Sequence, residues 1–93
     1  MYLMISTYLA PLDEVDKARQ AHMEFLDGLE ERGLVVAAGR QDPPVGGVIL
    51  LDTATAEEAV EAMAGDPYVQ QGLASYVATG WTPTRGALAA RNG

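Results

Sequence analysis

The sequence contains no cysteine and a single histidine, His22. Without cysteine the chain can form no disulfide, no thiolate metal site and no cysteine nucleophile. With one histidine, the usual ligand sets of zinc sites are also out of reach. We therefore predict that the protein binds no metal and works without a cofactor.

Basic residues are also few. Six Lys and Arg stand against thirteen Asp and Glu, which gives a formal net charge of −7. Nucleic acids and anionic membranes attract clustered positive charge, and these basic residues form no stripe. We therefore expect neither nucleic acid nor a membrane surface as a partner.

Long apolar runs are missing too, and the first residues lack the basic lead of a signal peptide. The absence of cysteine also fits a reducing compartment. Together these features predict a cytoplasmic protein that does not span a membrane.

What the chain does have is enough apolar sequence for one modest core, since 48% of its 93 residues are hydrophobic. We expect a single domain over residues 1–93, with residues 84–93 as a C-terminal extension. Residues 1–9 favour a strand because Tyr, Ile and Leu are frequent there. Neither face of this strand is strongly polar, so we expect helices on one face and a second subunit, in a homodimer, on the other.

The rest of the chain alternates helical and strand patterns. A helix is predicted from Pro11 to about Arg32, with Gly33 as its left-handed stop. Strands are predicted over 34–38, 48–52 and 75–81, and a capping box over 55–58 opens the second helix. A short helix after Asp66 and Pro67 follows. The order βαββαβ predicts an α+β fold, a ferredoxin-like sandwich with both helices on one face of an antiparallel sheet.

His22 lies in the middle of the apolar stripe of the first helix. A buried imidazole needs a hydrogen-bond partner, because a polar group taken out of water must be satisfied again. The residues on the stripe are Val15, Ala18, His22, Phe25, Leu26 and Leu29. Such a histidine is either a satisfied core residue or a catalytic base.

Asp66 is the best candidate partner for His22. A carboxylate that accepts a proton from one imidazole nitrogen fixes the tautomer and leaves the other nitrogen as a base. Asp66 also precedes Pro67 at a helix start, which is an ordinary capping arrangement. Both roles can coexist, and we predict that the two side chains lie within hydrogen-bonding reach at the edge of a pocket.

The order of motifs along the chain resembles the YciI-like (YCII-related) family. The matching pieces are Arg19-x-x-His22, Ala38-Gly39, Gly46-Gly47-Val48-Ile49-Leu50, Asp66-Pro67-Tyr68-Val69 and Thr82-Pro83-Thr84-Arg85-Gly86. The resemblance implies the fold of the dimeric α+β barrels and an active site that pairs His22 with Asp66. One branch of the family is associated with lyase-like or dehydrohalogenating chemistry on cyclic, hydroxylated substrates, which the resemblance makes a candidate reaction here.

Five further residues are candidates for substrate binding. Arg19 lies one turn before His22, where it either binds a substrate carboxylate or enolate or forms a rim salt bridge. Tyr68 either donates to a substrate oxygen or packs in the core. Ser6 and Tyr8 share one face of the first strand. Residues 40–44 are predicted to form a loop because of the paired prolines. Arg40 stands where many members of the family have proline, which changes the shape and charge of this loop.

Two classes of function stay open at this point. One is a cofactor-independent enzyme, lyase-, dehydrohalogenase- or isomerase-like, in which His22 is the base, Asp66 orients it and Arg19 steadies negative charge. The other is a module that binds a small molecule, or another protein, without turnover. A monooxygenase-like protein of the same architecture is a further enzyme alternative. We also predict that residues 42–45 form a rim loop able to gate the cavity.

Overall fold

The computed structural model describes residues 1–89. Fraying is an expectation for Arg91, Asn92 and Gly93 because they are terminal, and these three lie outside the described residues. The elements follow one another in the predicted order of strands and helices. They are β1 (Tyr2–Tyr8), α1 (Leu12–Lys17), α2 (Arg19–Glu31), β2 (Val35–Arg40), β3 (Gly47–Leu51), α3 (Ala56–Met63), α4 (Pro67–Gln70) and β4 (Ala74–Gly80).

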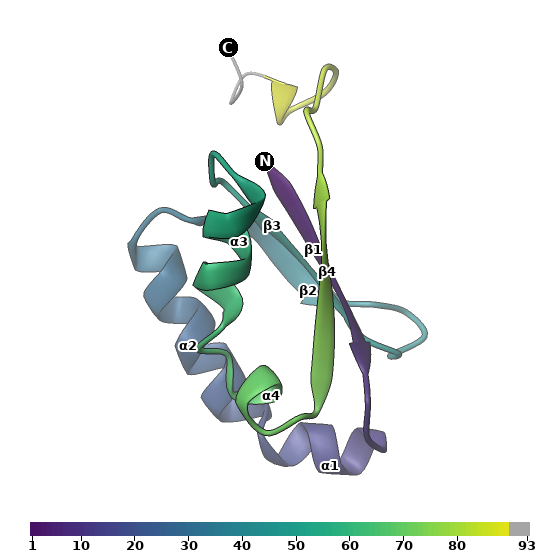
Figure 1. The fold of residues 1–93 in the computed structure, drawn as a ribbon. Coiled ribbons are helices and arrows are strands. Elements are labelled where there is room, and N and C mark those ends of the chain that lie inside the picture. The colour runs from purple at the N-terminus through teal and green to yellow at the C-terminus, as the bar shows by residue number, and fades with distance from the viewer. Residues whose placement is uncertain (90–93) are drawn as a thin grey trace.

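The four strands form one sheet in the order β2-β3-β1-β4, and all neighbouring strands are antiparallel. Helices α2 and α3 lie side by side over one face of this sheet, and α1 crosses below its lower end (Figure 1). This is a ferredoxin-like α+β sandwich, so the predicted fold class is confirmed.

The core lies between the sheet and the helices and consists of two clusters. The larger cluster joins the centre of the sheet to α2 and α3 through Met4, Leu26, Leu29, Ile49, Leu51, Ala59 and Met63. The smaller cluster lies where α1 and α4 meet the end of β4 and contains Val15, Ala18, Tyr68 and Ala74.

The predicted single helix from Pro11 to Arg32 is wrong, because the structure breaks it at Ala18. The backbone there turns to φ −99° and ψ 2°, which ends α1 and starts α2. The two clusters give the physical reason. Val15 on α1 packs beside Tyr68, whereas Leu26 on α2 packs on the sheet. One straight helix could not aim both parts of the stripe at these separate clusters.

The ends of several elements follow the predicted turn chemistry. Gly33 has φ +74° and directly follows the C-cap of α2, where the predicted helix was expected to stop. The Thr55 side chain accepts a hydrogen bond from the backbone N–H of Glu58 and caps α3. The predicted loop begins too early, however, because Arg40 is still the last residue of β2 and pairs with Gly47 of β3.

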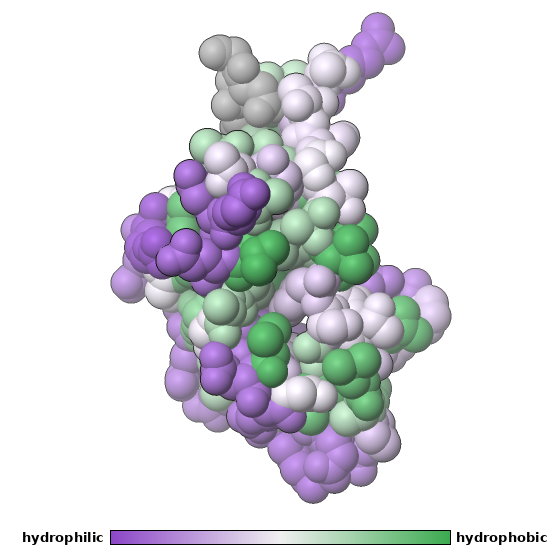
Figure 2. Space-filling view, in the orientation of Figure 1, coloured by the Kyte–Doolittle hydropathy of each residue, from purple (hydrophilic) through white to green (hydrophobic). Residues whose placement is uncertain are grey.

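The face of the sheet away from the helices carries exposed apolar side chains. Ile5 of β1 pairs with Val77 of β4, and both are exposed. By contrast, hydrophilic residues gather over α1 and over the outer side of α2 (Figure 2). None of the helices in residues 1–89 has the length and apolarity needed to cross a membrane.

Candidate active site

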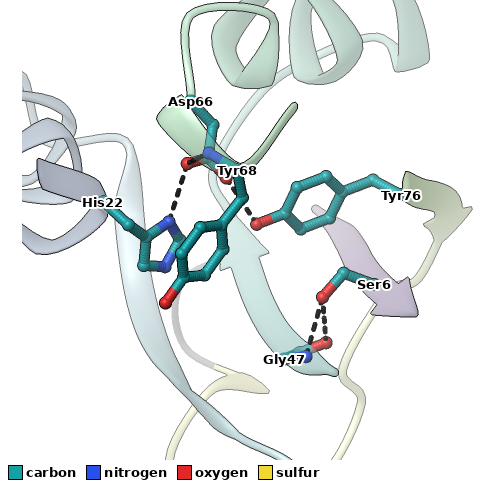
Figure 3. A network of polar contacts seen from close by, with 6 residues as sticks. All are labelled: Ser6, His22, Gly47, Asp66, Tyr68 and Tyr76. Atoms are coloured by element: carbon teal, nitrogen blue, oxygen red, sulfur yellow. Dashed lines mark hydrogen bonds and ion pairs between the residues drawn. The ribbon is translucent and has the colours of Figure 1, made fainter. Parts of the chain in front are cut away.

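His22 and Asp66 lie in direct contact, 44 positions apart in the sequence. His22 projects from the first turn of α2, and Asp66 precedes α4 (Figure 3). The distance between His22 Nδ1 and Asp66 Oδ1 is 2.7 Å. The Asp66 side chain is 0% exposed and that of His22 is 12% exposed. The predicted hydrogen bond is therefore present. Because both side chains are largely shielded from water, the contact suits a short, charge-assisted hydrogen bond.

Asp66 accepts hydrogen bonds on both of its oxygens. Oδ1 accepts from the backbone N–H of Tyr68, at 3.0 Å, in addition to His22. Oδ2 accepts from the hydroxyl of Tyr76 on β4, at 2.7 Å. The first of these bonds is a helix cap and the second joins the cap to the sheet. Asp66 thus holds α4, α2 and β4 together at one point.

Tyr76 is a site residue that sequence reasoning missed. Burial raises the pKa of Tyr76, and the charge and hydrogen bond of Asp66 raise it further. Its phenol therefore stays protonated at neutral pH and donates to Asp66. The alternation along β4 is the pattern that points to Tyr76. Side chains two positions apart on a strand lie on the same face, and Tyr76 is two positions from the buried Ala74.

The pattern around Asp66 sets the tautomer of His22. Since Asp66 acts as an acceptor toward the Tyr68 amide and the Tyr76 hydroxyl, His22 Nδ1 is the donor in the third bond. In the neutral ring Nε2 then carries the lone pair. In the described residues every fully buried side-chain nitrogen or oxygen has a hydrogen-bond partner. His22 Nε2 has no partner among these residues, so this nitrogen is not fully buried and is open to solvent.

A cavity of about 180 Å³ lies beside this ring, between the sheet and α2. All of the predicted substrate-binding residues line it, namely Ser6, Tyr8, Arg19, Arg40 and Tyr68. His22 lines it as well, whereas Asp66 lies behind the ring and does not. Much of the remaining wall is formed by Met23, Leu26, Ile49 and Tyr76, none of which was predicted to belong to the site.

Tyr68, one of the three tyrosines that line the cavity, fixes the plane of the histidine. The rings of His22 and Tyr68 are stacked, with centroids 4.0 Å apart and an angle of 6° between the planes (Figure 3). Tyr8 meets Tyr68 edge to face at 6.0 Å. Tyr68 is buried in the smaller cluster and also lines the cavity, so both of its sequence interpretations describe part of its position.

Arg40 lines the cavity and is held by two partners. Its Nε donates to the hydroxyl of Tyr8 at 3.0 Å, and one terminal nitrogen pairs with Asp16 of α1. The bond to Asp16, ahead of that to Tyr8, raises the pKa of Arg40 above its usual range. Neither partner was predicted, because Asp16 and Tyr8 lie 24 and 32 positions away from Arg40 in the sequence.

Ser6 lines the cavity, but its hydroxyl is already engaged. The backbone N–H of Gly47 donates to Ser6 Oγ at 2.7 Å (Figure 3). The neighbouring loop is tied to β1 as well, since Gln41 Nε2 donates to the Ser6 carbonyl and the Tyr8 N–H donates to Val45. None of residues 42–45 lines the cavity, so gating by this loop stays a prediction.

The described residues contain no group of three His, Asp or Glu side chains placed to hold a metal ion. What the site offers is a solvent-open imidazole nitrogen, a buried carboxylate behind it, and arginine and tyrosine side chains around one cavity. This arrangement suits proton transfer to or from a small molecule.

The fold and the cavity define a small α+β domain with a ligand-sized site between a four-stranded sheet and its helices. The YCII-related domain model matches residues 1–82, and the chain belongs to that family. The resemblance drawn from the sequence is therefore confirmed. No curated protein matches the chain.

A solved structure shares the fold. It is the 5-chloro-2-hydroxyhydroquinone dehydrochlorinase TftG from Burkholderia phenoliruptrix AC1100, in complex with 2,5-dihydroxybenzoquinone. The TM-score is 0.70 at 18% sequence identity, and the match covers 88% of this chain and 94% of the other. At this identity the likeness establishes the fold alone.

Proposed function

We propose that this protein is a small cofactor-independent enzyme that performs general acid–base chemistry on a cyclic, hydroxylated metabolite. One observation carries the proposal. His22 presents a free ring nitrogen to a cavity while its other nitrogen is held by a fully buried carboxylate. A histidine serving only the core would have both nitrogens bonded to protein.

In the proposed reaction His22 Nε2 removes a proton from the substrate. Asp66 keeps the proton on Nδ1 in place and stabilises the imidazolium that forms. The electron pair of the broken bond moves into the ring system, and in an elimination a leaving group such as chloride departs with its own electron pair. The proton then passes from His22 to solvent. In an isomerisation the same proton returns to a different atom.

Arg19 suits the charge that develops in this step. It lies one helical turn before His22 and lines the same cavity. Its guanidinium can stabilise an enolate- or phenolate-like oxygen during proton removal.

The likeness to TftG supports elimination as the first reaction to test. That protein is named as a dehydrochlorinase and its structure holds a dihydroxylated quinone. The present cavity, of about 180 Å³ and walled by Tyr68 and Ile49, is of a size and character that suits one six-membered ring.

The test is turnover of a panel of chlorinated and unsubstituted hydroxyhydroquinones. Turnover is measured as chloride release and as the change in absorbance of the ring. His22→Asn keeps a side-chain N–H that can reach Asp66 but removes Nε2, and we expect at least a hundredfold loss, in the range ~10²–10⁴ for a general base. Glu24→Gln, on the exposed side of the same helix, is the matched control and should leave the rate unchanged.

A non-catalytic binding module predicts a different result. Panel members would then bind and shift the melting temperature, but none would be converted, and His22→Asn would change affinity only. Turnover that survives intact in His22→Asn would exclude His22 as the base.

A further inference from the structure

The charge of the cavity is opposite to that of the protein. The chain has thirteen acidic and six basic residues, yet no Asp or Glu lines the cavity and two arginines do. Asp66, the nearest buried carboxylate, lies behind the His22 ring and is occupied by three donors. A ligand in the cavity therefore meets positive charge and neutral donors.

Arg40 is oriented so that it still has donors to offer. Tyr8 and Asp16 each accept one of its N–H groups, and a guanidinium carries several more. Because Arg40 Nε donates to the Tyr8 oxygen, the hydroxyl proton of Tyr8 is left to donate in another direction. Both residues line the cavity, so a ligand bound there lies beside the Arg40 guanidinium and the Tyr8 hydroxyl.

Tyr68 adds a third donor at this end of the cavity. Burial raises the pKa of the Tyr68 phenol, and both Arg40 and Arg19 act in the opposite direction. Both guanidinium groups are therefore close enough to influence the Tyr68 oxygen. Both arginines and both of these tyrosines line the same cavity as His22, whose ring stacks on that of Tyr68.

We propose that Arg40, held by Asp16 and Tyr8, selects substrates that carry an ionised oxygen substituent, a carboxylate or a phenolate. This oxygen binds at Arg40 while the reacting position of the substrate faces His22. This inference rests on the proposed function for the identity of the reacting end. The anion site itself depends only on Arg40, Tyr8 and the cavity. Asp16 is a positioning residue, because it reaches the ligand only through Arg40.

The experiment compares ligands that differ only in charge. Calorimetry with 3,4-dihydroxybenzoate and 3,4-dihydroxybenzamide measures the preference for a carboxylate. The pair 4-nitrophenolate and 4-nitroanisole measures the preference for a phenolate and separates the two sources of negative charge. We expect wild-type protein to favour at least one anion by about tenfold or more, as a charge-assisted hydrogen bond should give.

Variants then locate the preference. Arg40→Gln should bring the anion-to-neutral ratio close to one, and Asp16→Asn should reduce it part of the way. Arg32→Gln makes the same change of charge at the far end of α2, outside the cavity, and should preserve the ratio. A ratio near one in the wild type, or an unchanged ratio in Arg40→Gln, would overturn the proposal.

Two further measurements keep the test decisive. If Arg40→Gln does not fold, the Arg40 Nε resonance of wild-type protein should shift with the benzoate and stay in place with the benzamide; an equal response to both would refute selection by Arg40. His22→Asn should lose turnover but keep the anion ratio. Failure of the proposed enzyme activity and failure of the anion site are therefore separate results.

Discussion

Asp66 has two roles that the sequence could not separate. Its Oδ1 caps α4 and also accepts from His22. Asparagine keeps a cap oxygen but supplies no negative charge, so Asp66→Asn should retain most of the stability and lose most of the activity. Asp66→Ala should lose both, with a drop of about 1–3 kcal/mol in the free energy of unfolding. Urea denaturation and turnover of the same samples would check this, and equal stability of the two variants would contradict the capping role.

Tyr76 should make the stability of the protein depend on pH in the alkaline range. Folding raises the pKa of Tyr76, so its contribution to stability is complete below the unfolded-state value of about 10 and is lost as the pH rises through the folded value. We expect Tyr76→Phe to cost about 1–3 kcal/mol at neutral pH, because one oxygen of a buried carboxylate loses its donor.

The difference in unfolding free energy between wild type and Tyr76→Phe should shrink as the pH passes above about 10. Urea denaturation at neutral and alkaline pH measures it, with Tyr2→Phe as the control for loss of a phenol. A difference that stays constant with pH would mean that the Tyr76 proton does not support the fold.

Single residues of the site were predictable to different degrees. His22 stood out because it is the only polar residue on an apolar stripe, and Asp66 because a carboxylate before proline marks a helix start. Asp16 and Tyr76 were not found, since their partners depend on how separate elements pack. The engagement of the Ser6 hydroxyl by Gly47 was equally hidden, because it depends on the distance between two strands.

Among the elements, the turn between β2 and β3 depends on one glycine. A Cβ at Gly46 would overlap with the carbonyl oxygen of Ser6 on β1. Gly46→Ala should therefore displace this turn and cost about 2 kcal/mol or more. Gly28 is the matched control, since a Cβ there meets nothing within 4 Å and lies inside α2, where alanine should add about 0.5–1 kcal/mol. Thermal unfolding of both variants tests the contrast, and a fully stable Gly46→Ala would refute the crowding.

Element types were predictable where local chemistry decides them. The cap at Thr55 and the stop at Gly33 come from the residues themselves. The break at Ala18 was not predictable, because no proline or glycine marks it. It arises from the two clusters that α1 and α2 pack against, and those exist only in the folded chain.

For the whole molecule, we expect a homodimer that covers the open face of the sheet. Val77 is 66% exposed there and Ile5, its neighbour across the strands, is 39% exposed. Apolar side chains grouped on one face are typical of a subunit interface. Val77→Asp should therefore produce monomers in light scattering. Val60→Asp, at an exposed valine of α3, should leave the mass unchanged, and a wild-type monomer at micromolar concentration would exclude the dimer.

The oxygen shared by His22 and Tyr68 has one more consequence. The backbone N–H of Tyr68 and the imidazole Nδ1 compete for Asp66 Oδ1, so a change in the charge of the ring alters the electron density that the amide experiences. The Tyr68 amide is therefore a built-in spectroscopic reporter. In a two-dimensional nitrogen–proton spectrum, a ligand that takes up the Nε2 lone pair should move the chemical shift of this amide without touching the amide itself.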